Sequence, residues 1–239
     1  MKIATWNLGY MSPGAHKGKI KEAYDYFFNE IQADFHLFQE GSIDDLGAYA
    51  KKVEFEKISY FNQKAITGVY SQRKKIKKIE TEQSLPGSFC AVDAGDICLT
   101  SLYAIVDHLD RKNDRIIYYA GNLHKIFSDM GHILWNYHKK FKWHLVGGDF
   151  NTDPSYHGNT KDTKADLLLL ERRITESFAL KNCNHEAKIK KPTYRSSRGS
   201  EYQLDYIYLS QGKSMKSLSI VKNEQTQMLS DHLPLVIEL

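Results

Sequence analysis

The sequence predicts an α/β fold in which two β-sheets are covered by helices. Segments with the alternating pattern of strands and segments with the spacing of helices are interspersed over all 239 residues. Hydrophobic residues make up 41% of the chain and aromatic residues 12%, which is enough for a substantial core. No repeat, low-complexity tract or Pro/Gly/Ser-rich linker divides the chain. We therefore expect one domain spanning residues 1–239.

The expected elements follow in a mixed order. A strand at 2–6 precedes a helix at 18–31, where apolar residues recur at helical spacing, and a second strand at 35–38. The centre is rich in β-branched and aromatic residues, which predicts strands at 58–61, 65–71, 88–93 and 96–106, with turns at Pro86-Gly87 and Gly95. Helices are expected at 126–141 and 164–173. The remaining strands are expected at 143–146, 203–209, 217–221 and 233–239.

Charge and cysteine content narrow the class of protein only a little. Lys and Arg number 33 against 29 Asp and Glu, and the net charge of +4 identifies no partner. Basic residues cluster at 73–78, 139–142 and 188–191, which fits either phosphate binding or solvated surface. No apolar run approaches the roughly 20 residues of a membrane span, and the N-terminus lacks the apolar stretch of a secretory signal. With three cysteines that cannot all pair, we expect a reduced, cytoplasmic protein without membrane association.

Acidic and amide residues are concentrated at the expected strand ends, where α/β folds present side chains to ligands. Asn7 ends the first strand, and Glu40 ends the second beside Gly41, which would permit a sharp exit turn. Asp149 and Asn151 follow a strand and two glycines that would let the backbone turn tightly. The two side chains would face one way if the chain stays extended.

Two more acidic positions flank later strands. Asp205 opens an apolar strand, and Ser230-Asp231-His232 immediately precedes the last one. Taken singly, each of these polar residues is explained as a cap, a turn or a surface carboxylate. Together they would place three or four carboxylates in one cleft, where they repel one another unless a divalent cation neutralises them. Oxygen ligands without thiolates favour Mg²⁺, with Mn²⁺ possible, over zinc, and such a site suits phosphoryl chemistry.

Five short motifs occur in a fixed order along the chain: Thr5-Trp6-Asn7, Gln39-Glu40, Gly148-Asp149-Phe150-Asn151, Gln203-Leu204-Asp205-Tyr206 and Ser230-Asp231-His232-Leu233-Pro234. In this order and near these intervals they resemble the motifs of the endonuclease/exonuclease/phosphatase superfamily, whose fold is that of pancreatic deoxyribonuclease. The resemblance extends from residue 5 to residue 234. It implies an α/β, four-layer sandwich of two mixed β-sheets flanked by helices, and Mg²⁺-dependent cleavage of a phosphoester.

The resemblance implies a metal site on the acidic residues. Glu40 matches the principal metal carboxylate of the family, with Asn7 and Asp231 close enough to assist directly or through water. Some relatives carry an acidic residue two positions after the asparagine of the first strand. Because Gly9 occupies that position here, a second metal site is not expected.

The resemblance also implies the groups that act on the phosphate. Asp149 matches the residue that orients or deprotonates the attacking water, and Asn151 matches its neighbour that holds a phosphate oxygen. His232 matches the histidine that contacts the scissile phosphate, and Asp205 the carboxylate that orients this histidine. A carboxylate partner favours the imidazolium, which would stabilise a phosphorane-like transition state.

Two residues are alternatives for a further phosphate contact. Tyr103 lies in a strand that resembles the segment where relatives place a tyrosine or histidine at the phosphate. His124 follows about twenty residues later, just before the expected helix, whose N-terminus would itself attract phosphate. If they have no role at the phosphate, Tyr103 is explained as a core tyrosine and His124 as a histidine that caps the helix.

The superfamily contains nucleases, inositol-phosphate phosphatases, sphingomyelinases and nucleotide-ester hydrolases, so the fold does not choose the substrate. Basic and aromatic residues at 188–198 fit a grip on a nucleic-acid backbone with stacking. We therefore expect a nuclease for DNA or RNA, with no obligate protein partner. The alternatives are a phosphatase or phosphodiesterase for a small-molecule or lipid-headgroup phosphoester, and a non-catalytic binding module.

Overall fold

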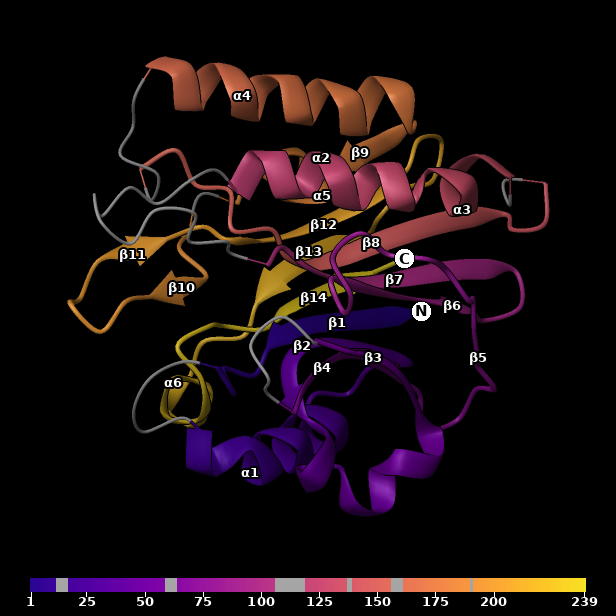
Figure 1. Cartoon of the computed structure of the whole chain (residues 1–239). Coiled ribbons are helices and arrows are strands. Elements are labelled where there is room, and N and C mark those ends of the chain that lie inside the picture. The colour runs from indigo at the N-terminus through magenta and orange to yellow at the C-terminus, as the bar shows by residue number, and fades with distance from the viewer. Residues whose placement is uncertain (12–16, 59–63, 106–118, 137–138, 156–160, 190) are drawn as a thin grey trace.

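The computed structural model describes the chain except residues 12–16, 59–63, 106–118, 137–138, 156–160 and 190. In the described part, two six-stranded sheets pack face to face, and helices cover their outer faces (Figure 1). The N- and C-termini lie side by side, where the amino group of Met1 donates to the carbonyl of Leu239 at 3.0 Å. This is the four-layer α/β sandwich that the sequence predicts.

The first sheet has the strand order β13-β14-β1-β2-β4-β3. The bounds of these strands are Ser217–Ile220 (β13), Leu235–Glu238 (β14), Lys2–Asn7 (β1), Phe35–Ser42 (β2), Ala65–Tyr70 (β4) and Val53–Lys57 (β3). β1 and β2 are parallel, with Asn7 opposite Gln39. The carboxyl ends of both strands therefore meet at one edge of the sheet.

The second sheet has the order β5-β6-β7-β8-β12-β9. Its strands are Lys77–Lys78 (β5), Phe89–Asp93 (β6), Ile97–Tyr103 (β7), Trp143–Asp149 (β8), Asp205–Ser210 (β12) and Leu180–Asn182 (β9). β7 and β8 are parallel, whereas β12 runs antiparallel to β8 with Asp205 opposite Asp149. The start of β12 thus lies beside the end of β8.

Helices cover both outer faces. On the second sheet lie α2 (Tyr119–Asp129), α3 (Gly131–Asn136) and α4 (Lys161–Arg172), while α1 (Ile20–Asp25) covers the first sheet (Figure 1). The short helices α5 (Cys183–Glu186) and α6 (Glu224–Leu229), π-helical turns at Tyr26–Glu30 and Arg173–Ser177, and 3₁₀ turns at Lys17–Lys19, Ile43–Asp45 and Gly47–Lys52 complete the helical elements. A separate hairpin pairs β10 (Tyr194–Arg195) with β11 (Glu201–Tyr202). No helix in the described residues is long and apolar enough to cross a membrane.

The side chains of each strand point alternately to its two faces, and they contribute to three hydrophobic cores, one between the sheets and one under the helices on each outer face. In β1, Ile3 points into the core between the sheets, whereas Ala4 and Trp6 point toward α1. In β8, Leu145 lies between the sheets and Val146 packs beneath the helices of the second sheet. β1 and β8 are buried along nearly their whole length and carry few charged residues, which helps the sequence to indicate them as strands.

The structure corrects several expected elements. The single helix expected at 126–141 is wrong, since α2 begins at Tyr119 and ends at Asp129, and Gly131, a poor helix former, opens the separate helix α3. The helix expected at 18–31 is α-helical only at Ile20–Asp25 and continues as a π-turn. Part of the strand expected at 58–61 lies outside the described residues, and the edge strand β3 just before it was missed. The strand expected at 35–38 continues to Ser42.

Gly147 and Gly148 do not form the tight turn that the sequence predicts, because both lie inside β8. Gly148 has φ 152°, and a Cβ placed on it would collide with the backbone carbonyl of Leu102 in β7. Its hydrogen therefore lets β7 and β8 approach next to Asp149.

We expect Gly148→Ala to lower the free energy of unfolding by about 3 kcal/mol, measured by urea denaturation. Gly18→Ala is the matched control, since no atom lies within 4 Å of its Cβ position. Equal stability of the two variants would show that the close approach at Gly148 is not needed.

Candidate active site

Six of the predicted residues meet where the two sheets come together at one edge. They come from the end of β1, a bulge within β2, the end of β8 and the residues after it, the start of β12 and the loop before β14: Asn7, Glu40, Asp149, Asn151, Asp205 and His232. None is more than 7% exposed. Buried polar groups require partners, and the partners of these six are mostly one another.

His232 lies between two carboxylates. Its Nδ1 is 2.9 Å from Oδ2 of Asp205, and its Nε2 is 3.8 Å from Oδ2 of Asp149. The antiparallel pairing of β8 with β12 places the two aspartates opposite each other, and the loop before β14 brings the imidazole to both. The Asp205–His232 pair predicted from the resemblance is thus in hydrogen-bonding contact.

Asn7 joins the two sheets through its side-chain amide. Its Nδ2 donates to Oε1 of Glu40 at 3.0 Å and to Oδ2 of Asp149 at 2.9 Å. Its Oδ1 accepts the backbone N–H of Gly9 at 2.9 Å. Although the sequence predicts Asn7 as a metal ligand, its oxygen is engaged by the backbone and its nitrogen faces the carboxylates. In this geometry Asn7 positions Glu40 and Asp149.

Glu40 sits in a β-bulge rather than at a strand end. β2 carries one extra residue between Phe38 and Gly41 relative to β4, and Glu40 has φ 48°. Its Oε2 accepts the backbone N–H of Met11 at 2.9 Å. The expected exit turn at Gly41 is absent; a Cβ there would collide with Tyr24 and Phe38, so this glycine serves close packing. The bulge re-aims the carboxylate toward Asn7.

Asn151 also has a left-handed backbone, with φ 50°. The chain after β8 is therefore not extended, and the condition under which Asp149 and Asn151 would face one way is not met. The turn lets Oδ1 of Asp149 accept the N–H of Asn151 at 2.9 Å. The side-chain Nδ2 of Asn151 donates to the carbonyl of Ala104 and to Oδ2 of Asp149. Both amide hydrogens are therefore engaged, and Asn151 orients Asp149. Left-handed non-glycine residues are strained and concentrate at functional sites, and both Glu40 and Asn151 adopt this conformation.

Burial and mutual charge shift the pKa values of these groups. Burial raises the pKa of the Asp149 carboxyl. The charge of His232 lowers this pKa, whereas the charges of Asp205 and Glu40 raise it further. Burial alone would lower the pKa of His232, but the charges of Asp205 and Asp149 outweigh it and raise this pKa well above its usual range. Burial also raises the pKa of Glu40, partly offset by its hydrogen bond from Asn7. His232 is consequently an imidazolium at neutral pH.

The acidic side chains fit a divalent cation. Three buried carboxylates, Glu40, Asp149 and Asp205, face one imidazolium, so this part of the site has an excess of negative charge. One ligand atom each from Asp149, Asp205 and His232 lies within 4.8 Å of the others. Oδ1 of Asp205 is buried without a hydrogen-bond partner among the described residues. Carboxylate oxygens are ligands for hard divalent cations.

Asp231 and Tyr103 border this cluster. The charge of Asp231 acts on both Glu40 and His232, and its backbone carbonyl accepts the N–H of Arg195 at 2.9 Å. Tyr103 ends β7 and is the register partner of Asp149 in the parallel pair β7·β8. Both residues thus lie next to the six that meet.

His124 is not brought to the cluster. It lies inside α2, so the helix N-terminus expected beside it is absent, and its Nδ1 is 3.2 Å from Nη1 of Arg173. The same Nη1 donates to the carbonyl of His124 at 2.7 Å. Burial and the charge of Arg173 lower the pKa of His124. A neutral histidine held in this way supports the packing of α2 against the π-turn at Arg173–Ser177.

Four further residues hold His232 and Asp205 in place, a role that the sequence did not predict for any of them. Nε1 of Trp6 donates to the carbonyl of His232, and Oγ of Ser230 accepts the N–H of His232 while donating to the carbonyl of Asn7. The ring of Tyr194 lies 4.7 Å from the ring of His232, centroid to centroid. Thr193 accepts the backbone N–H groups of Leu204 and Asp205 at 3.1 and 3.0 Å. Trp6 and Ser230 belong to the motifs, but nothing in the sequence marks Thr193.

We expect Thr193→Val to misplace Asp205, because it leaves two buried N–H groups without their acceptor. The free energy of unfolding should fall by about 1–3 kcal/mol, and kcat should fall about tenfold as His232 loses its fixed partner. Thr193→Ser keeps the hydroxyl and should retain kcat. If the valine variant were as active as the serine variant, this support of Asp205 would be irrelevant.

Solved structures share this fold, although no protein-family model and no curated protein matches the sequence. A 3′-5′ exonuclease (NExo) from Neisseria meningitidis superimposes with a TM-score of 0.73 at 14% identity, covering 100% of this chain and 99% of its own. A variant of 3′ phosphatase NExo from Neisseria, bound to product DNA hairpin, gives 0.68 at 16% identity with the same coverage. An endonuclease/exonuclease/phosphatase family protein from Leptotrichia buccalis gives 0.60 at 17% identity, covering 100% of this chain and 99% of its own. The chain has the fold of the endonuclease/exonuclease/phosphatase superfamily.

Proposed function

We propose that this protein is a Mg²⁺-dependent phosphoesterase that hydrolyses phosphoester bonds of nucleic acid. The observation that carries the proposal is the buried imidazolium of His232, held by Asp205 and facing Asp149 beside Glu40. A non-catalytic binding module would not need a charged histidine between two buried carboxylates. Because the site contains residues from both sheets, residues 1–239 form one functional unit.

The side chains divide the work by their geometry. Asp205 holds Nδ1 of His232, which leaves the Nε2–H edge to donate to a non-bridging phosphate oxygen. Asp149 takes the proton of the attacking water in its ionised form, in which its raised pKa makes it a stronger base than an exposed carboxylate. Asn7 and Asn151 keep Asp149 in place through their amides.

Glu40 and Asp231 are the groups assigned to hold the cation. His232 has no free lone pair for a metal while it is an imidazolium. Glu40 and Asp231 are carboxylates, and the charge of Asp231 raises the pKa of Glu40. When bound, Mg²⁺ supplies Lewis-acid neutralisation of phosphate charge. Mn²⁺ has the same preference for oxygen ligands and is expected to substitute.

Nucleic acid is the substrate that the surroundings of the site favour. The segment that leads into Thr193 and the hairpin β10–β11 carries Lys191, Arg195 and Arg198, with stacked rings of Tyr194 and Tyr202. The similar structures include a 3′-5′ exonuclease and a 3′ phosphatase bound to product DNA hairpin. These features support a nucleic-acid strand as the substrate.

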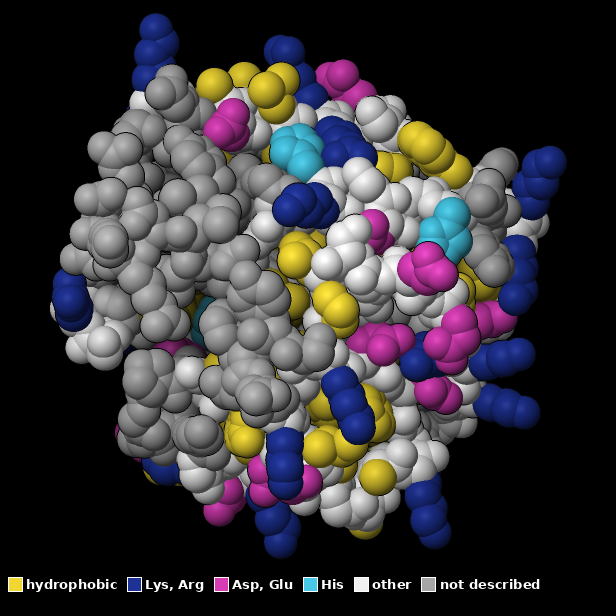
Figure 2. Space-filling model, viewed as in Figure 1, with side chains coloured by type: hydrophobic (Ala, Val, Ile, Leu, Met, Phe, Trp, Pro, Cys, Tyr) yellow, Lys and Arg dark blue, Asp and Glu magenta, His cyan; other side chains and the backbone are white. Residues whose placement is uncertain are grey.

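The other two basic clusters give no such support. Lys140 and Lys142 pair with Asp93 and Asp96 before the start of β8, at the opposite end of this strand from Asp149. Lys78 pairs with Glu56 and Glu80. Figure 2 shows Lys and Arg side chains spread over this face and its outline rather than gathered in one patch. The grip on substrate is therefore assigned to the residues near the hairpin alone.

The test is an assay of single- and double-stranded DNA and RNA, and of DNA ending in a 3′-phosphate, with Mg²⁺, Mn²⁺ or EDTA. We expect hydrolysis of at least one nucleic acid that EDTA abolishes and Mg²⁺ restores. Turnover of inositol phosphates or another small phosphoester without any nucleic-acid cleavage would instead establish the alternative substrate class.

We assign the protein to a reducing, cytoplasmic compartment, in keeping with the buried free thiols of Cys90, Cys98 and Cys183.

A further inference from the structure

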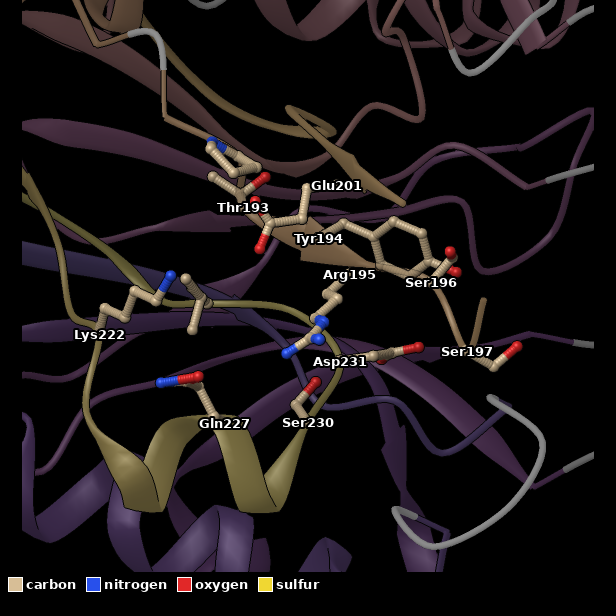
Figure 3. Close-up of a pocket in the computed structure, with 12 residues that line it drawn as sticks. Thr193, Tyr194, Arg195, Ser196, Ser197, Glu201, Lys222, Gln227, Ser230 and Asp231 are labelled. Carbon is tan, nitrogen blue, oxygen red and sulfur yellow. The ribbon is translucent and has the colours of Figure 1, made fainter. Parts of the chain in front are cut away.

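A cavity of about 260 Å³ lies beside the proposed active site, between the hairpin β10–β11, the loop before β14 and helix α6 (Figure 3). Its wall includes Thr193, Tyr194, Ser230 and Asp231. Each of these also contacts or borders the site: Thr193 holds Asp205, Tyr194 packs on His232, and Ser230 binds the N–H of His232. A group bound in the cavity is therefore close to residues that contact Asp205 and His232.

Two cationic side chains reach into this cavity from different elements. Arg195 extends from β10 toward α6, and Lys222 extends from the segment between β13 and α6 (Figure 3). The backbone N–H of Arg195 is fixed by the carbonyl of Asp231 at 2.9 Å, so the base of the side chain is anchored. Within the described part of the chain, the guanidinium of Arg195 and the ammonium of Lys222 form no hydrogen bond or ion pair. These two cations are therefore available to a ligand.

The rest of the lining selects what kind of anion fits. Glu201 and Asp231 add two carboxylates to the wall, and Gln227 adds an amide. Because Asp231 is assigned to the cation, Glu201 is the carboxylate that offsets the two cationic side chains, which disfavours a bare polyanion. The lining instead suits a ligand with a phosphate for the cations and a hydroxyl or amino donor for Glu201, as a nucleotide has.

We propose that this cavity binds the nucleotide adjoining the scissile phosphate, with Arg195 and Lys222 holding its phosphate and Glu201 accepting a hydrogen bond from its sugar or base. The inference rests on the proposed function and narrows it.

The test compares Arg195→Ala and Lys222→Ala on two substrates with Mg²⁺. One is a short single-stranded DNA, and the other is bis(p-nitrophenyl) phosphate, which has a single phosphate and no adjoining nucleotide. Each variant should raise KM for the DNA about tenfold with kcat unchanged, and leave kcat/KM for the small ester unchanged. Lys142→Ala, which removes the same charge at the far end of β8, should behave as wild type on both. Unchanged KM for DNA in both cavity variants, or equal losses on the two substrates, would overturn the proposal.

A binding measurement separates this inference from the proposed function. Fluorescence anisotropy of a labelled single-stranded trinucleotide with wild type and Arg195→Ala requires no turnover. Binding weakened about tenfold in the variant supports the cavity even if the wild type hydrolyses nothing, which would reject only the proposed function. Equal binding rejects the cavity even if the wild type is an active nuclease. Inorganic phosphate as competitor shows whether the cavity takes a free anion; displacement of the trinucleotide by phosphate alone at equal concentration would also overturn the nucleotide assignment.

Discussion

His232→Ala should lower kcat for nucleic-acid hydrolysis at least about a thousandfold with little change in KM. The variant removes the only imidazole in the cluster of six, and with it the positive charge that faces the transition state. It also leaves Asp205 and Asp149 buried without their shared counter-charge. Single-turnover kinetics with excess enzyme measures the chemical step directly and shows whether the loss is in catalysis rather than binding.

A second histidine provides the control for this experiment. His124→Ala should keep kcat within about twofold, because His124 contacts Arg173 and lies outside the cluster. Far-UV circular dichroism of both variants checks that each is folded. If His124→Ala were as impaired as His232→Ala, the phosphate contact would have to include α2, contrary to the geometry described above.

Glu40→Gln should abolish the stabilisation of the protein by Mg²⁺. For the wild type, a cation that binds only the folded state should add about 2.7 kcal/mol at a hundred times its dissociation constant, seen as a rise in Tm. The glutamine keeps the size of the side chain and can still meet Asn7, but it removes one of three buried negative charges. The metal-free variant should therefore melt above the metal-free wild type, while Mg²⁺ no longer raises its Tm.

The same charge excess should appear as a pH dependence of the metal-free wild type. The folded state raises the pKa of Asp149, so the folded state binds a proton more tightly than the unfolded chain does. Stability should fall as the pH rises above about 4, the pKa of an unfolded aspartate, and keep falling until Asp149 has ionised in the folded protein. Asp149→Asn should flatten this part of the profile, and thermal melts in EDTA from pH 4 to 8 test it. A wild type that is more stable at pH 8 than at pH 5 in EDTA would contradict the assignment.

Much of the site could be predicted because its residues sit in short motifs with their own chemistry. Asp149, Asp205 and His232 were assigned from such motifs, and the structure brings them within hydrogen-bonding or near-contact distance. Most of the buried strands were also predicted, since they contain β-branched and aromatic residues and few charges. The hairpin β10–β11 was missed because each of its strands has only two residues, and edge strand β3 was missed although its sequence alternates apolar and charged residues.

Other features depended on contacts that no local pattern records. The glycines at 147–148 seemed to make a turn, and the structure shows that they lie inside β8, where Gly148 allows a neighbouring carbonyl to approach. Asn7 resembled a metal ligand, yet the direction of its amide is set by Gly9 on one side and by Glu40 and Asp149 on the other. Thr193 was not predicted at all, since its role depends on where the start of β12 lies.

The sequence by itself predicted the two sheets and the candidate side chains for the chemistry, because residue type and strand periodicity are local properties. Only the tertiary structure decided how those side chains face one another. The contacts that orient them join residues 33, 142 and 27 positions apart, as in Asn7–Glu40, Asn7–Asp149 and Asp205–His232. The direction of a hydrogen bond, the charge state of a buried imidazole and the cavity beside Arg195 all arise from such distant pairs. They exist only once the two sheets have packed and water has been excluded from between them.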